Sequence, residues 1–340
     1  MIRFTNDYSE GCHPLILKAM EAANLEGNFG YSLDPHSEHA HALIRAACGR
    51  PDADVHILVG GTQTNQTAIS AFLRPYEAVI AASTGHVCVH ETGAIEATGH
   101  KCIACPADDG RLTPEAVRAA YAANTTEHMV KPALVYVSET TEVGTLYSYA
   151  QLKALRAVCD ELGLLLYLDG ARLGSALAAG AVTLPQLGEL ADAFYIGGTK
   201  NGALFGEALV ILNARLKPCF RYNIKQRGGM LAKGWMLGVQ FEVLLQNDLY
   251  TELGRHENAL ALRLRDGIAA LGYPFASHSE TNQQFPILPD AVVEKLAPDF
   301  SFEFSSKPDA SHTAIRLVTS WATQPESIDA FLRALAAAAK

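Results

Sequence analysis

The sequence predicts an α/β protein whose main domain is a doubly wound, mostly parallel sheet of seven strands, followed by a smaller C-terminal α+β domain. Short apolar runs recur along the chain, and most of them are continuous rather than alternating, which is typical of strands buried on both faces. They span residues 55–60, 78–82, 101–106, 133–138, 164–169, 193–197 and 207–212.

Segments with helical periodicity lie between these runs, at residues 66–73, 91–98, 114–123 and 149–162. Two of them carry start signals. Thr113 is a candidate N-cap before Pro114, and Ser148 precedes the fourth segment. Because strands that alternate with helices pair in parallel, this order predicts helices on the faces of a doubly wound sheet.

The pattern changes after Gly234. Two helical stretches, two strand-like pieces and an alanine-rich helix follow, at residues 234–249, 253–271, 284–288, 315–319 and 325–339. This outline is typical of a smaller α+β domain. We expect an N-terminal arm and helix over residues 1–45, a large domain over 46–246 and a small domain over 247–340.

The composition indicates a globular protein that does not bind nucleic acid. Of its 340 residues, 49% are hydrophobic and 19% are charged, and the net charge is -9. A duplex-binding protein needs a basic stripe against the phosphates, and the sequence contains no basic run. An anionic small molecule is still compatible with this charge, because its site needs only a few local cations.

Three features of the sequence favour the cytoplasm. The 7 cysteines are scattered and odd in number, which suits a reducing compartment better than a disulfide framework. The opening segment, MIRFTNDYSEG, lacks the apolar region of a signal peptide. No window approaches the roughly 18 apolar residues of a membrane helix, so we expect no membrane association.

The first candidate site motif is the turn GGTQTNQ, which begins at Gly60 directly after a predicted strand. Glycines allow a close backbone approach to an anion, and the following helix offers free N–H groups at its N-terminus. Gly61 and Thr62 are therefore candidate phosphate ligands. The spacing matches neither GxGxxG nor a P-loop, and the alternative is a tight turn with a threonine cap.

The second motif is Asp169, which ends an apolar strand in LYLDGARLG. An unpaired buried carboxylate is costly, so Asp169 should have a cationic partner. Two partners are open: Arg172, in a structural salt bridge, or the protonated ring nitrogen of a ligand.

The third motif is Lys200, in FYIGGTKNG, where a strand ends in a glycine-rich turn. Desolvation there would lower the pKa of the amine and make it nucleophilic. The alternative is a solvated surface lysine, the state of most lysines.

The fourth motif contains His86 and His90, in GHVCVHETGA. His86 could stack on a planar ligand, or it could be an ordinary core or capping histidine. The two histidines are spaced as on one helical face, but HExxH is absent, and we expect no metal site.

In this order, the phosphate turn, histidine, strand-end aspartate and lysine resemble fold type I pyridoxal-phosphate enzymes. The individual segments are most similar to the threonine aldolase / β-eliminating lyase-like family. The resemblance covers nearly the whole chain and rests on the segments NDYSEG, GGTQTNQ, GHVCVHETGAIEATGHK, DGRLTPE, TTEVGTLY, YLDGARLGSAL, GGTKNGALFGEA and RLVTSWAT.

The resemblance implies pyridoxal 5′-phosphate as the cofactor. Lys200 would form the Schiff base, Asp169 would bond the pyridine nitrogen, and His86 would stack on the ring. In the register of the phosphate-binding arginine of many relatives, this chain has Leu231, so Lys225 or Lys233 would replace that arginine. The remaining candidates for cofactor binding are Gly61, Thr62, Arg172 and Thr199.

The resemblance also assigns substrate contacts. Arg172 and Arg316 would hold the substrate carboxylate, because a guanidinium group binds a carboxylate through two hydrogen bonds. Asn6 stands where many relatives have serine, and Tyr31 would enter the site from an N-terminal loop, of the same subunit or a neighbouring one. His86 or His90 would be the catalytic base.

These assignments predict a lyase that cleaves L-threonine or L-allo-threonine to glycine and an aldehyde. The alternatives within the same chemistry are β-elimination and phenylserine cleavage. A nucleotide-binding enzyme and a non-catalytic relative are the alternatives outside it, and both leave Lys200 without a role. The resemblance further implies a homodimer or homotetramer with active sites at subunit interfaces.

Overall fold

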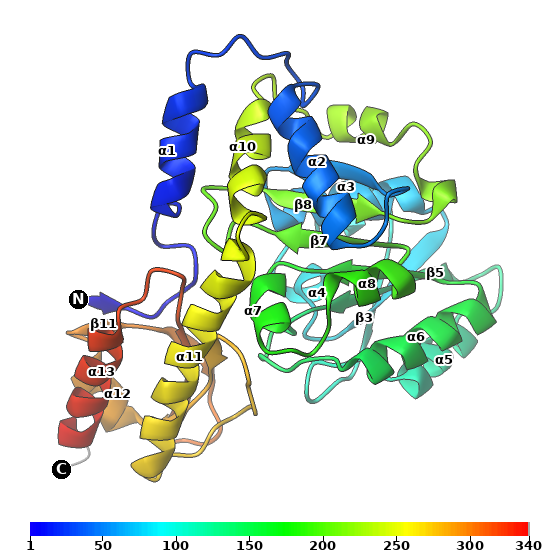
Figure 1. The fold of residues 1–340 in the computed structure, drawn as a ribbon. Helices are drawn as coiled ribbons and strands as arrows, with labels where there is room; N and C mark the ends of the chain where they lie inside the picture. The colour runs from blue at the N-terminus through cyan, green and yellow to red at the C-terminus, as the bar shows by residue number, and fades with distance from the viewer. Residues whose placement is uncertain (339–340) are drawn as a thin grey trace.

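A central sheet of seven strands organises the large domain (Figure 1). The computed structural model describes residues 1–338. The sheet has the order β2-β8-β7-β6-β5-β3-β4, and each strand overlaps one predicted apolar run. The strands are β2 (Asp54–Leu58), β3 (Glu77–Ala82), β4 (Cys102–Cys105), β5 (Lys131–Ser138), β6 (Leu165–Asp169), β7 (Ala193–Gly197) and β8 (Glu207–Ile211).

One strand runs against the others. β8 pairs antiparallel with both β2 and β7, whereas the remaining neighbours pair in parallel. The first residue of β8, Glu207, is the register partner of Leu58 on β2 and of Gly197 on β7. Because β2 and β7 end where β8 begins, all three strands contribute side chains to the same edge of the sheet.

Helices cover both faces of this sheet, as the alternating pattern predicts. Two separate apolar clusters, one on each face, contain the buried helix residues. One face packs against α2 (Pro35–Ala47), α5 (Pro114–Ala122), α6 (Tyr149–Leu162), α7 (Leu173–Ala178), α8 (Leu184–Leu190) and α10 (Trp235–Leu244). The other face packs against α3 (Gly61–Phe72), α4 (His86–Val89) and α9 (Phe220–Gln226).

The C-terminal part forms a smaller α+β unit beside the large domain (Figure 1). A third apolar cluster fills its core. Its small sheet has the order β10-β13-β12, and β9 also pairs with β13. The elements are α11 (Leu249–Ala270), β9 (Gln283–Gln284), β10 (Ile287–Pro289), α12 (Asp290–Leu296), β11 (Phe300–Ser301), β12 (Glu303–Ser306), β13 (His312–Val318) and α13 (Pro325–Ala338).

The N-terminal segment joins this smaller unit. β1 (Ile2–Arg3) pairs in parallel with β11, and the chain then passes to α1 (Pro14–Ala23), which packs against α10 (Figure 1). The predicted domain limits at residues 45 and 246 stay a prediction. No helix within residues 1–338 is long and apolar enough to cross a membrane.

The predicted helix over residues 91–98 is wrong. Only one 3-10 turn, Glu96–Thr98, forms there. Thr92, Gly93 and Gly99 have φ values of 53°, 70° and 93°, and such left-handed backbone interrupts an α-helix. The periodicity in this segment reflects a compact loop over the sheet rather than a continuous helix.

The long helix α11 lies unusually close to α7. A Cβ atom at Gly254 would lie 2.3 Å from the carbonyl oxygen of Gly174. This distance is far below van der Waals contact, so the two backbones can touch only because position 254 has no side chain. The contact joins α11 to the segment that directly follows Arg172.

Candidate active site

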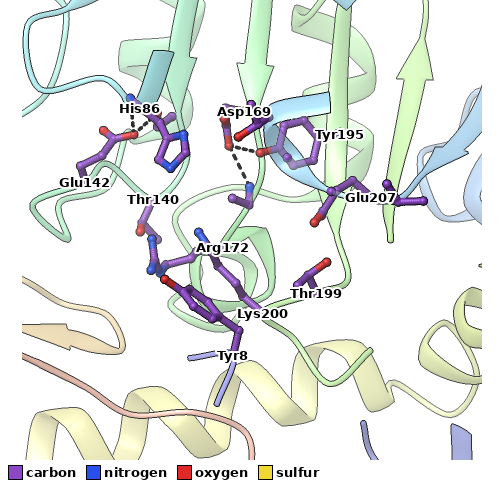
Figure 2. A pocket seen from close by; sticks show the side chains of 16 residues that line it. Tyr8, His86, Thr140, Glu142, Asp169, Arg172, Tyr195, Thr199, Lys200 and Glu207 are labelled. Atoms are coloured by element: carbon purple, nitrogen blue, oxygen red, sulfur yellow. Dashed lines mark hydrogen bonds between the residues drawn. The ribbon is translucent and has the colours of Figure 1, made fainter. Parts of the chain in front are cut away.

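A cavity of about 310 Å³ lies at the sheet edge where β2, β6 and β7 end and β8 begins (Figure 2). A second cavity of about 300 Å³ shares part of its lining. The residues common to both are Tyr8, His86, Glu142, Arg172 and Lys200. This position agrees with the rule that open α/β sheets bind ligands beyond the carboxyl ends of their strands.

Lys200 points into the cavity from the turn that follows β7 (Figure 2). Burial lowers the pKa of its amine, and the nearby Arg172 guanidinium lowers it further. The Nζ atom lies 6.0 Å from the centre of the Tyr8 ring. The structure therefore excludes a freely solvated surface lysine and leaves a partly buried amine beside a cavity.

Asp169 ends β6 and lies in the same cavity, where four donors hold its carboxylate. The donors are the Tyr136 hydroxyl at 2.6 Å, Asn65 Nδ2 at 2.8 Å, the Tyr195 hydroxyl at 2.5 Å and the Ala171 backbone N–H at 3.0 Å. Burial alone would raise the pKa of Asp169, but the field of His86 and these hydrogen bonds hold it below its ordinary value. Asp169 is thus an ionised group in an apolar setting.

The alternative salt bridge between Asp169 and Arg172 is wrong. Arg172 instead donates from Nε to Asp7 Oδ2 at 2.6 Å and from Nη2 to Asp7 Oδ1 at 3.1 Å. Asn282 Nδ2 also donates to Asp7, at 2.9 Å. The N-terminal segment therefore supplies the counterion that fixes Arg172, and Asp169 is left to face the cavity.

A hydrogen-bonded chain connects His86 to Asp169. His86 Nδ1 lies 2.8 Å from Glu91 Oε1, which also accepts from Asn65 Nδ2 at 2.8 Å. The same Asn65 amide donates to Asp169. The His86 backbone N–H donates to Glu142 Oε1 at 2.9 Å, so the ring and the backbone of His86 are both anchored. Figure 2 shows the His86 ring at the cavity wall.

The turn before α3 also lines the cavity. Gly60 is the N-cap of this 12-residue helix and makes no side-chain hydrogen bond, and Gly61 and Thr62 are the first two residues of the helix. The predicted alternative of a threonine cap is therefore wrong, since the Thr64 hydroxyl donates to the Gly60 carbonyl at 2.9 Å. The uncapped N–H groups and the positive end of the helix dipole are available to an anion.

Arg316 and His90 line the second cavity rather than the first. Arg316 lies on β13 and pairs through Nη2 with Glu303, its cross-strand neighbour on β12. Its Nε atom is buried without a partner among the described residues. Arg172 lines both cavities, so the two arginines approach the same space from different parts of the fold.

Four predicted residues line neither cavity: Asn6, Tyr31, Lys225 and Lys233. Asn6 Oδ1 accepts from the backbone N–H of Tyr8 at 3.0 Å and so shapes the segment that carries this ring. Lys225 Nζ lies 4.6 Å above the ring of Tyr31, which is 42% exposed. The roles assigned to these four residues stay predictions.

Sequence reasoning missed several residues of the lining. Tyr195 lies in the middle of the apolar run of β7, and nothing in the sequence marks its hydroxyl as a partner of Asp169. Glu142 follows β5 in the polar segment SETTEV, and that position after a strand was a usable signal. Glu207 begins a strand instead of ending one, so only the antiparallel direction of β8 reveals it.

The lining fits pyridoxal 5′-phosphate, which the sequence resemblance implies. A partly buried amine of lowered pKa suits an imine with an aldehyde, and an ionised carboxylate suits a protonated pyridine nitrogen. The uncapped start of α3 suits a phosphate group. These three groups belong to one cavity, which is the arrangement that the cofactor requires.

Comparison with known proteins agrees with this interpretation. The family described as beta-eliminating lyase matches residues 6–291. A low specificity L-threonine aldolase of Pseudomonas aeruginosa is 33% identical over 299 residues, 86% of each chain. The solved structure of a Leishmania major threonine aldolase is 49% identical, with a TM-score of 0.97 and 98% of each chain covered.

A more distant structure shares the fold alone. A double mutant of Thermus thermophilus aspartate aminotransferase is 17% identical, with a TM-score of 0.72 over 99% of this chain and 91% of that one. The predicted fold class is therefore confirmed. Because the family match extends over most of the sequence and the cavity has the groups that such chemistry needs, the chain belongs to the beta-eliminating lyase family.

Proposed function

We propose that this chain cleaves L-threonine and L-allo-threonine to glycine and an aldehyde, as a pyridoxal-phosphate-dependent lyase of low specificity. One observation carries the proposal: the Lys200 amine, whose pKa is lowered, and the ionised Asp169 carboxylate face one cavity, and two arginines line the adjoining space. The curated relative of P. aeruginosa and the L. major structure, both named threonine aldolases, support this activity.

The chain's own residues would hold the cofactor at four points. Lys200 would bond its aldehyde, Asp169 would accept a hydrogen bond from its ring nitrogen, and His86 would stack on its ring. The backbone N–H groups of Gly61 and Thr62 would bind its phosphate. When bound, the cofactor withdraws the electrons that remain at Cα of the substrate when a bond to that carbon breaks.

Arg172 and Arg316 would hold the substrate carboxylate and so select the bond that breaks. Arg172 is fixed by two hydrogen bonds to Asp7, which leaves it little freedom to rotate. Two guanidinium groups on one carboxylate fix its plane as well as its position. Orientation of this kind can turn the Cα–Cβ bond of threonine into the reactive one.

His86 or His90 would take the proton of the substrate hydroxyl. If Glu91 accepts from His86 Nδ1–H, then His86 Nε2 has a lone pair for the proton. His90 lies next to it, with 5.5 Å between the ring centres, and burial lowers the pKa of His90. Both histidines are therefore candidates for the catalytic base.

If the two arginines hold the substrate carboxylate, the size of their effect on substrate binding can be predicted. Arg172→Ala or Arg316→Ala should raise KM for L-threonine by about 10- to 150-fold, which corresponds to about 1.5–3 kcal/mol for hydrogen bonds to a charged group. Steady-state kinetics of the two variants test this. Arg118→Ala, at an exposed ion pair with Glu161 on α6, is the matched control and should keep the wild-type KM. An unchanged KM in both site variants would refute the proposal that these arginines bind the substrate carboxylate.

The activity itself is tested by a side-by-side assay. L-Threonine, L-allo-threonine, phenylserine and serine are incubated with the purified protein, and glycine and aldehyde are measured. We expect glycine from both threonine isomers. Absence of glycine from all four compounds contradicts the proposal, and a strong preference for phenylserine favours the bulkier-substrate alternative.

The same proposal includes a cytoplasmic homodimer or homotetramer with active sites at the subunit interface. Exposed apolar side chains on α1 and on the loop after it support an interface, because such patches are costly in water. They are Leu15, Leu17, Leu25, Phe29 and Leu33. All 7 cysteines are free thiols, which agrees with a reducing compartment.

Subunit mixing tests the shared site. Tyr31→Ala and Lys200→Ala are each expected to be impaired, and a mixed oligomer of the two should regain part of the activity. Regain is expected only if Tyr31 of one subunit completes the site that contains Lys200 of another. No regain, although light scattering shows mixed oligomers, would contradict the shared site.

A further inference from the structure

Glu207 is one of three carboxyl groups that line the cofactor cavity, with Asp169 and Glu142, and it faces the cavity from the start of β8 (Figure 2). Its register partner on β2 is Leu58, two residues before the Gly60 turn that opens α3. On its other side, Glu207 pairs with Gly197, three residues before Lys200. Glu207 therefore lies between the anion-binding turn and the amine.

The hydrogen bonds of Glu207 are few compared with those of Asp169. Glu207 Oε2 accepts from the Gly198 backbone N–H at 3.1 Å. The Thr199 hydroxyl also hydrogen-bonds to it, while Thr199 Oγ1 accepts from the Gly206 N–H at 3.1 Å. Four donors keep Asp169 ionised, whereas Glu207 has two and is only 4% exposed. In the same cavity, the Asp169 carboxylate is thus well compensated by hydrogen-bond donors, whereas the Glu207 carboxyl is not.

The groups around Glu207 do not compensate its charge either. One neighbour is a cation. The others are a carboxyl group and three tyrosine phenols, and none of these carries a positive charge. They are Lys200 after β7, Asp169 and Tyr167 on β6, Tyr195 on β7 and Tyr250 on α11. Burial, opposed by Thr199 and Lys200, raises the pKa of Glu207 to about 8. When two acids in one cavity are driven in opposite directions, they have different protonation states at neutral pH.

We propose that Glu207 is a positioning residue that carries a proton when the cofactor is bound and directs this O–H toward the phosphate group at the start of α3. This inference rests on the proposed function only in placing the phosphate at that turn. A neutral carboxyl adds a donor to the uncapped helix N-terminus. An ionised carboxylate at the same place repels a phosphate dianion, and the buried setting strengthens that repulsion.

The proposal has a distinct signature in the pH dependence of binding. Below pH 8 the Glu207 carboxyl is already protonated, so phosphate binding does not change its protonation state. Above pH 8, binding must take up one proton, so affinity should fall by about tenfold per pH unit. The phosphate of the ligand has its own pKa near 6, which lies outside this window.

Pyridoxine 5′-phosphate is the appropriate probe, because it has the phosphate but no aldehyde and cannot bond Lys200. Its binding to the cofactor-free protein is measured by calorimetry from pH 7 to 9.5, for the wild type and for Glu207→Gln. We expect the wild-type affinity to fall above pH 8 and the affinity of the variant to stay level, since glutamine imitates the protonated acid. Glu207→Ala should bind more weakly than Glu207→Gln at every pH.

Three outcomes overturn the proposal. The first is a wild-type affinity that does not change with pH. The second is the same fall in affinity above pH 8 in Glu207→Gln. The third is an equal fall in affinity for pyridoxine, which has no phosphate. The second outcome would assign the titration to another group, such as Lys200 or the ring of the ligand. If Glu207→Gln does not fold, the wild type is measured at pH 8.5 in two buffers of different ionisation enthalpy, and no proton uptake refutes the proposal. Threonine cleavage is scored separately, so an inactive protein that shows this pH signature contradicts the proposed function alone.

Discussion

Lys200→Ala is expected to abolish threonine cleavage, with kcat lowered by about 10⁴-fold or more, the upper end of what a positioned acid–base group contributes. Lys200 is the amine that faces the cavity, and desolvation lowers its pKa. Alanine removes the group that would bond the cofactor aldehyde and that would move protons at the substrate. Free cofactor would still enter the cavity, because Asp169 and the start of α3 are unchanged.

Two measurements check this expectation. The wild type should be yellow, and borohydride should fix the cofactor to the peptide that contains Lys200. The Lys200→Ala variant should show neither property after dialysis. Lys101→Ala, at an exposed lysine just before β4, is the control and should behave as the wild type. Normal turnover of Lys200→Ala, or labelling of another lysine, would refute the assignment.

Asp169→Asn is the second large effect that we expect, with kcat lowered by about 10²–10³-fold, the cost of removing one preorganised electrostatic partner. Asparagine has the same shape but no charge, so it cannot favour a protonated ring nitrogen. Its amide also presents hydrogens toward hydroxyls that now donate to the carboxylate. Those hydroxyls belong to Tyr136 and Tyr195.

Kinetics and the visible spectrum together isolate this effect. The variant should retain bound cofactor, because Lys200 and α3 are intact, while kcat falls and the absorption band shifts. Asp108→Asn, at an exposed aspartate outside the site, is the matched control. Wild-type kcat in Asp169→Asn would show that this carboxylate does not act on the cofactor.

The seven-stranded sheet could be predicted because its strands are continuous apolar runs, and burial on both faces leaves such runs in any sequence. The ends of these runs also located Asp169 and Lys200, and the family resemblance, the cofactor and the lyase activity agree with the comparisons. The short helices α7 and α12 were missed because seven residues or fewer show too little periodicity.

The partners of the site residues could not be predicted from the sequence. Arg172 pairs with Asp7, which is 165 positions away, and no local pattern encodes a contact of this kind. The same holds for Asn65, which donates to Glu91, 26 positions away, and to Asp169, 104 positions away. These links depend on how strands and loops meet in space, and apolar periodicity contains no information on that.

If Arg172 and Arg316 hold the substrate carboxylate as proposed, the contact at Gly254 ties substrate affinity to one interhelical distance. α11 packs on α7 through bare backbone, and α7 begins directly after Arg172. α11 belongs to the small unit that contains Arg316 and packs there against α13 and β9. Even one methyl group at position 254 would therefore push α11 away from α7 and increase the distance between the two guanidinium groups. Natural selection for substrate binding should thus act on Gly254, although this residue does not contact the substrate.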